Sequence, residues 1–181
     1  LLEVAKNVAR KLGEAKKTLL FVGGKNEARD IIKAKAETLG MPYVAGRWIG
    51  GTLTNFPEIK KRMARLEDLQ DKRSRGEFEG KYTKRERLMF DREITDLLAT
   101  FGGIAGLKSL PGALFVIDSR REHIPIAEAK IMKIPVIALM NSDCDLKQVT
   151  YPVIGNDSAR SSISFFVDEI AKAYQEGLLS Q

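Results

Sequence analysis

The sequence RWIGGTLTNFPEIKKR, Arg47–Arg62, joins two regions of different character and decides how the rest of the chain is interpreted. Before it, short apolar runs alternate with helical patterns, and after it a long charged segment has apolar residues at helical spacing. Gly50-Gly51 gives the backbone access to positive φ and allows another group to approach closely. The residues Asn55–Glu58, with a proline at the third position, are typical of a capped helix start.

Trp48 is the only tryptophan in the chain, and it follows Arg47 directly. Two interpretations of this pair stay open at this point. The two side chains could stack on a base or clamp a phosphate. Alternatively, the segment is a glycine turn before a helix and Trp48 fills the core, which the general preference of tryptophan for burial favours.

The segment after this stretch predicts two antiparallel helices joined at a tip. Its apolar residues recur at three-four spacing in two groups, Phe56, Ile59, Met63 and Leu66, then Phe90, Ile94, Leu97 and Phe101. Gly76 and Gly80 lie between the groups, and Thr83–Glu86 matches a capping box. Each apolar stripe is narrow, so we expect a coiled-coil hairpin over residues 55–101 that projects from a body formed by residues 1–54 and 102–181.

The sequence of the body predicts alternating strands and helices. A helix is expected up to Gly13, and further helices at Asn26–Leu39, Ile124–Lys133 and Ser161–Tyr174. Apolar runs predict strands at Thr18–Val22, Pro42–Ala45, Ala113–Ile117, Pro135–Met140 and Tyr151–Ile154. This order implies parallel strands with right-handed crossovers, hence an α/β fold with a doubly wound sheet of about five strands.

Positive charge is concentrated on the predicted hairpin. The chain of 181 residues carries 30 Lys and Arg against 24 Asp and Glu, a net charge of +6. Lys60–Arg87 alone holds eleven bases and six acids, a net charge of +5, so the remainder is almost neutral. A basic arm suits a polyanion such as nucleic acid, although a solvated hairpin with internal ion pairs would show the same pattern.

Composition also excludes several classes of protein. Cys144 is the only cysteine, so no disulfide framework and no thiol metal cluster is expected, which fits a reducing compartment. No apolar run approaches the length of a membrane span, and no signal peptide is visible. The chain opens on a helical pattern at Leu1 without a methionine, so we expect further residues upstream.

Polar loops at the expected carboxyl ends of the strands are candidate active sites, because ligands of parallel sheets bind there. Gly23–Asn26 lacks the spacing of a phosphate-binding loop. Asp118, Glu122 and the single histidine, His123, could form a metal or acid–base site, but helix capping explains them more simply. Cys144 has no nearby histidine to activate it. Gly155–Ser162 opens the last helix and could bind an anion there, cap that helix, or do both.

The stretch Arg47–Arg62 closely resembles the signature of the bacterial type of the small-subunit ribosomal protein S-two family. Three later blocks match the same family in the same order, LPGALFVID at Leu110–Asp118, EAKIMKIPVIAL at Glu128–Leu139 and YPVIGNDSARSSI at Tyr151–Ile163. The resemblance implies a flavodoxin-like fold with a coiled-coil hairpin, no catalysis, no cofactor and no metal. It also implies binding to small-subunit ribosomal RNA beside neighbouring small-subunit proteins, in a cytoplasmic or an organellar ribosome, with no membrane and no small-molecule substrate.

Carried over residue by residue, the first signature falls on Arg47, Trp48, Gly50, Gly51, Thr52, Thr54 and Asn55, and the last block on Gly155, Asn156, Asp157, Arg160 and Ser161. Among the hairpin bases we predict phosphate contacts for Lys60, Lys61, Arg62, Arg65 and Arg85. The alternative is a nucleotide-dependent enzyme on a Rossmann-like fold. The lack of a complete glycine-rich fingerprint disfavours that alternative.

Overall fold

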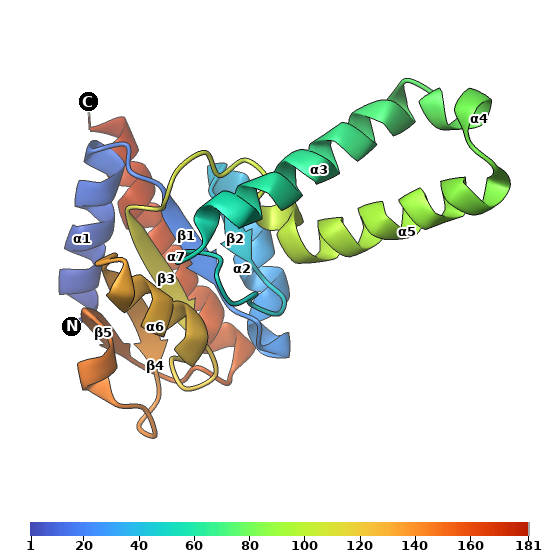
Figure 1. Ribbon diagram of the computed structural model, residues 1–181. Helices are drawn as coiled ribbons and strands as arrows, with labels where there is room; N and C mark the ends of the chain where they lie inside the picture. The colour runs from blue at the N-terminus through green and yellow to red at the C-terminus, as the bar shows by residue number, and fades with distance from the viewer. Residues whose placement is uncertain (181) are drawn as a thin grey trace.

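The computed structural model describes residues 1–180, and its centre is a five-stranded sheet in which all strands run parallel (Figure 1). The strands are β1 (Leu19–Val22), β2 (Tyr43–Val44), β3 (Ala113–Ile117), β4 (Val136–Met140) and β5 (Tyr151–Ile154). Their order across the sheet is β2-β1-β3-β4-β5, the order of flavodoxin-like folds. The predicted α/β class and the doubly wound parallel sheet of about five strands are confirmed.

The apolar runs form strands because helices cover both faces of the sheet. Every residue of β1, β3 and β4 is buried. Neighbouring residues alternate between two clusters, as the period of a strand requires: Leu19 and Phe21 pack on one face, Leu20 and Val22 on the other. Two layers of core therefore flank the sheet.

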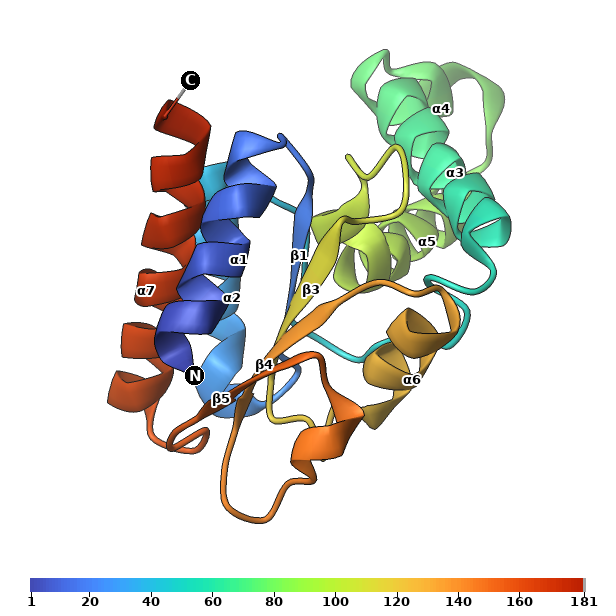
Figure 2. The same ribbon diagram turned by 90° about the vertical axis from the view of Figure 1, so that its left-hand side faces the viewer.

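The helices divide between the two faces of the sheet (Figure 2). They are α1 (Leu2–Glu14), α2 (Asn26–Leu39), α3 (Phe56–Ser74), α4 (Glu77–Lys81), α5 (Lys84–Phe101), α6 (His123–Ile131) and α7 (Arg160–Leu179), with 3₁₀ turns at Gly102–Ile104 and Leu146–Gln148. Helices α1, α2 and α7 cover one face, while α6 and the inner ends of α3 and α5 cover the other. The winding direction therefore reverses between β1 and β3.

Helices α3 and α5 run antiparallel and extend away from the sheet (Figure 1). A separate small core holds their outer halves together, made by Leu66, Leu69, Phe78 and Ile94. The predicted capping box at the start of α5 is formed, with the Glu86 N–H donating to Thr83 Oγ1 and the Thr83 N–H donating to the Glu86 carboxylate. The tip contains the short helix α4, where the sequence indicated only a loop. The coiled-coil description of this pair stays a prediction.

Neither α2 nor α3 begins with a capping bond from an asparagine side chain. Asn26 is the first residue of α2 rather than its cap, and Lys25 holds the capping position. Asn55 does precede α3, with proline in the first turn, but its side chain forms no capping bond. Gly40 ends α2 at a positive φ of 64°, as its glycine predicts.

The two end helices, α1 and α7, pack against each other through glycines. A Cβ on Gly177 would lie 2.0 Å from the carbonyl oxygen of Arg10, and one on Gly13 would lie 2.2 Å from that of Tyr174. The helix backbones therefore touch at this crossing. Among the described residues, no helix is both long enough and apolar enough to cross a bilayer.

Candidate nucleic-acid interface

The loop before α3 folds around one buried carboxylate on α6, that of Glu128. Five hydrogen bonds of 2.8–3.2 Å end on it. The donors are Trp48 Nε1, the backbone N–H groups of Gly51, Leu53 and Thr54, and Thr54 Oγ1. Glu128 is only 6% exposed. A buried charge is tolerated when its oxygens accept this many bonds, so the carboxylate serves as the anchor of the loop.

This anchoring bears on the two interpretations of Trp48. The indole is 6% exposed and packs in the core beside the sheet, with its N–H committed to Glu128. Thr52 is 2% exposed, and its hydroxyl donates to the Ile49 carbonyl. The indole N–H of Trp48 and the hydroxyl of Thr52 are therefore committed to the chain's own hydrogen bonds, and contact of these two residues with RNA stays a prediction. Thr54 has an exposed surface, but its hydroxyl is likewise committed to Glu128.

The same bonds shift the acidity of Glu128. Burial alone would raise its pKa, but the hydrogen bonds from Trp48, Leu53, Thr54 and Gly51 outweigh burial and lower the pKa below the ordinary 4.5. A carboxylate whose pKa is lower in the folded protein than in the unfolded chain stabilises the fold. The stabilisation is complete at pH values above the unfolded-state pKa, and it is lost as pH falls through the folded-state pKa.

We therefore expect the stability difference between the wild type and Glu128→Gln to shrink in acid. Glutamine does not titrate, so the difference in the free energy of unfolding should be constant from about pH 7 to about pH 5 and decrease below that. Urea unfolding curves at stepped pH values measure it. A difference that stays the same down to about pH 3 would contradict the assignment.

The exposed part of the signature gathers at the root of the helical pair. Gly50, Gly51, Asn55 and Arg62 line one groove with the inner end of α5. Gly51 adopts a φ of 91°, where a side chain would be strained, so this residue shapes the floor of the groove. Arg47 is exposed at the start of the loop. These predicted site residues are brought together on one surface, unlike Trp48 and Thr52.

The five hairpin bases predicted to contact phosphate differ in their partners. Lys61 Nζ lies 2.6 Å from Glu58, and Arg65 forms a two-pronged ion pair with Glu93 at 2.9 and 3.1 Å. The ammonium of Lys60 lies 5.5 Å from the centre of the Phe56 ring, and within residues 1–180 neither Arg62 nor Arg85 forms an ion pair. Lys60, Arg62 and Arg85 therefore keep their charge available, while Lys61 and Arg65 are partly neutralised.

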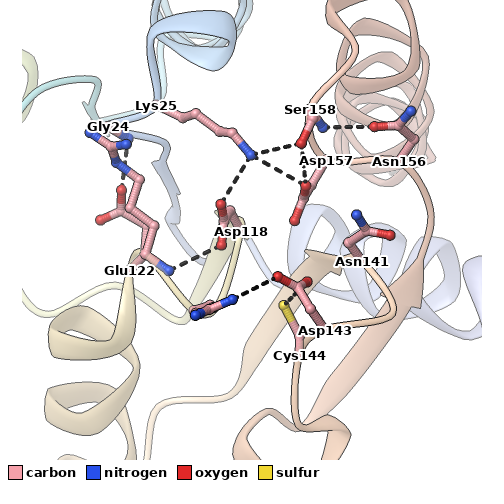
Figure 3. Close-up of polar contacts among 12 residues, drawn as sticks. Gly24, Lys25, Asp118, Glu122, Asn141, Asp143, Cys144, Asn156, Asp157 and Ser158 are labelled. Carbon is pink, nitrogen blue, oxygen red and sulfur yellow. Dashed lines mark hydrogen bonds and ion pairs between the residues drawn. The ribbon is translucent and has the colours of Figure 1, made fainter.

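The block before α7 is held largely by its own side chains. Asn156 Oδ1 accepts from the N–H groups of Ser158 and Ala159 and closes the turn before α7, whose N-cap residue is Ala159, without a side-chain capping bond. Arg160 lies 3.3 Å from Asp30, and Ser161 is exposed at the start of the helix. Asp157 is buried and points toward β3 instead (Figure 3). Of the three predicted contact residues here, Ser161 is the one without a side-chain partner among the described residues.

Lys25 closes the carboxyl end of the sheet by joining three strand ends (Figure 3). Its Nζ lies 3.1 Å from Asp118 and 3.3 Å from Asp157, and it donates to Ser158 at 3.0 Å. Asp118, Cys144 and Asp157 hold their ligand atoms within 4.8 Å of one another, as a metal site would. The lysine ammonium already balances these two carboxylates, however, so the cluster is satisfied by the chain's own cation.

The loop after β1 also has its donors occupied. The Gly24 N–H donates to Glu122 Oε1 at 2.9 Å, and a Cβ on Gly24 would meet that oxygen and the Gly46 carbonyl. Burial raises the pKa of Glu122, and the Gly24 N–H lowers it in part, leaving it raised. A glycine-rich loop that cradles phosphate offers free N–H groups, and here the Gly24 N–H is already taken. His123 is exposed at the start of α6.

Sequence reasoning did not identify Glu128 or Lys25 as organising residues. Each looks like an ordinary charged residue on a helix or in a loop, and the partners lie 74 to 133 positions away. The only local signal was the position of Lys25 directly after a buried strand, which places a side chain at the sheet edge where ligands usually bind.

Comparison with known proteins supplies an independent result. A family model described as "Ribosomal protein S2" matches residues 1–177. The protein named "Small ribosomal subunit protein uS2" from Rhodococcus opacus is 45% identical over 161 residues, covering 89% of this chain and 56% of that protein. Proteins of the same name from Acidothermus cellulolyticus and Sulfurimonas denitrificans are 43% and 44% identical, covering 91% and 89% of this chain and 60% and 62% of theirs. The chain thus spans a little over half the length of these relatives.

Proposed function

The chain belongs to the ribosomal protein S2 family, and from this premise we propose that it is a non-catalytic structural constituent of the small ribosomal subunit that supports translation. It binds small-subunit ribosomal RNA and lies beside neighbouring small-subunit proteins, in a cytoplasmic or an organellar ribosome. Its role needs no cofactor, metal or small-molecule substrate. The sheet-based body of residues 1–54 and 102–181 and the helical hairpin of residues 55–101 act as two parts of one RNA-binding surface.

The observation that carries this proposal is the exposed, unpaired positive charge on the projecting helices. Lys60 and Arg62 lie near the root of α3, and Arg85 lies in the first turn of α5 near the tip. A rigid arm of this kind places cations at two separated points along an RNA backbone. Contacts of this type position the protein without reading bases, because they neutralise phosphates and release counterions.

Salt dependence of binding tests the role of these bases. We expect the triple variant Lys60→Gln, Arg62→Gln, Arg85→Gln to bind small-subunit ribosomal RNA more weakly at low salt. Its slope of log affinity against log salt should be shallower by about 2 to 3, since each lost phosphate contact removes roughly 0.7 to 0.9. Filter binding at stepped salt concentrations measures both quantities.

Two further variants make the comparison specific. Lys61→Gln with Arg65→Gln removes two bases that are already ion-paired, so the slope should change by less than the loss of two free bases. Lys16→Gln, Lys147→Gln and Lys172→Gln remove three exposed charges from the body, and the slope should stay close to that of the wild type. Equal slopes for all three variants would reject the assignment of the hairpin as an RNA contact.

A further inference from the structure

We propose that a second phosphate-binding site lies on the body, in a cavity lined by three arginines, Arg29, Arg47 and Arg121. The cavity has a volume of about 320 Å³, at the small end of the range for ligand pockets. Its walls come from the residues that follow β1, β2 and β3. This inference deepens the proposed function, since an RNA phosphodiester is one source of such a group.

Three separate segments bring the arginines to one place. Arg29 lies in the first turns of α2, Arg47 in the loop after β2, and Arg121 just before α6. Arg29 is held there because its Nε donates to the Gly24 carbonyl at 3.0 Å, which leaves its terminal amino groups available. Within residues 1–180, none of the three forms an ion pair. Arg121 is attracted to the Glu122 carboxylate, but three arginines line the cavity with this one carboxylate, and the excess of positive charge favours an anion.

Among residues 1–180, Glu122 is the only acid that lines the cavity, and its carboxylate is committed to the chain. Glu122 is 5% exposed, and its Oε1 accepts the Gly24 N–H (Figure 3). The wall therefore carries three cations against one buried carboxylate. Guanidinium groups match a phosphate through paired N–H donors, which makes arginine the residue best suited to this geometry.

The position in the fold supports the same assignment. The cavity lies at the carboxyl end of the sheet, beside the point between β1 and β3 where the winding reverses. Ligands of open α/β sheets bind at this point, because the loops on either side turn away in opposite directions and leave a crevice. Here the crevice presents arginine side chains rather than a free glycine-rich loop, so the ligand is held by its charge.

Trp48 also lines the cavity, and it is the only tryptophan in the chain. Its fluorescence therefore reports on this site, whereas the hairpin contains no tryptophan. We would titrate the wild type with a fragment of small-subunit ribosomal RNA, and separately with AMP and inorganic phosphate. A saturable change in Trp48 emission is expected with at least one probe. A response to RNA alone identifies a phosphodiester as the ligand, and a response to the small phosphates identifies a free phosphate or nucleotide.

Neighbouring arginines provide matched variants. Arg121→Gln should weaken binding by about tenfold or more, the effect of losing a charge-assisted hydrogen bond. Arg120→Gln, which removes the same charge one residue away but from an ion pair with Asp143, should change it by less than about twofold. Arg47→Gln, exposed and outside the core, is the second test and should behave like Arg121→Gln. Thermal melts of each variant verify folding.

The outcomes separate this site from the proposed function. If RNA binds in the filter assay while Trp48 emission stays constant and the Arg120 and Arg121 variants bind alike, the cavity is not a phosphate site, and the RNA-binding role stands. If the small phosphates change Trp48 emission but RNA does not bind at all, the cavity is a phosphate site, and the RNA-binding role fails. No response of Trp48 to any probe overturns the inference.

Discussion

Replacing Glu128 with alanine is expected to lower the free energy of unfolding by roughly 3–5 kcal/mol. The substitution removes the carboxylate and leaves several donors without an acceptor. These donors are Trp48 Nε1 and the N–H groups of Gly51, Leu53 and Thr54. Those of Trp48 and Leu53 lie in the core, where water cannot easily replace the carboxylate. Each unsatisfied buried donor costs about 1–3 kcal/mol, partly relieved by rearrangement of the loop. Urea unfolding monitored by circular dichroism measures the change.

A second measurement shows where the loss occurs. Trp48 is the only tryptophan in the chain, so tryptophan emission reports on this loop alone. The emission should shift to longer wavelength in the folded variant, because the indole loses its hydrogen-bond partner and meets water. Glu67→Ala provides the control, since Glu67 is an exposed glutamate on α3, and surface changes of this kind usually stay within about 0.5 kcal/mol. A Glu128 variant as stable as the Glu67 variant would show that the loop does not depend on this carboxylate.

The sheet could be predicted because its signal is local. A run such as Leu19–Val22 is apolar at every position, and only a strand covered on both faces places every residue in the core. The capping box at Thr83 is local as well, since its partners lie three residues apart. Parallel pairing then follows from the strand–helix alternation. These features need no knowledge of distant contacts.

The site could be predicted only in part, because its organising contacts are long-range. Glu128 stands in a predicted helix as a single acidic residue, and nothing near it indicates that a loop more than 70 residues earlier will enclose it. Trp48 was predicted as either core or RNA-facing for the same reason. Arg29 and Arg121 showed no motif, and only the reversal of winding between β1 and β3 brings them to one cavity.

Gly177→Ala is expected to lower the free energy of unfolding by roughly 2–3 kcal/mol, although alanine is normally favoured over glycine in a helix. In an open helix, alanine is about 1 kcal/mol better than glycine, so the sign depends on the packing. The added Cβ would lie 2.0 Å from the Arg10 carbonyl oxygen and 3.0 Å from the Glu14 nitrogen. Both are backbone atoms of α1, which no side-chain rotation can move. The helices must separate, and gaps then open beside Ala9 and Ala173, which are buried in the same cluster.

Gly80→Ala is the matched control, because this glycine lies in α4 and a Cβ there would meet nothing within 4 Å. The same chemical change should stabilise that site by about 0.4–1 kcal/mol, so the two variants are expected to differ in sign. Gly13→Ala tests the crossing from the other helix, with a Cβ 2.2 Å from the Tyr174 carbonyl oxygen. Combined with Gly177→Ala it should cost less than the sum of the two, since one separation of the helices relieves both contacts. Additive losses would mean that the two glycines act independently, and the backbone contact between α1 and α7 would then not be the cause.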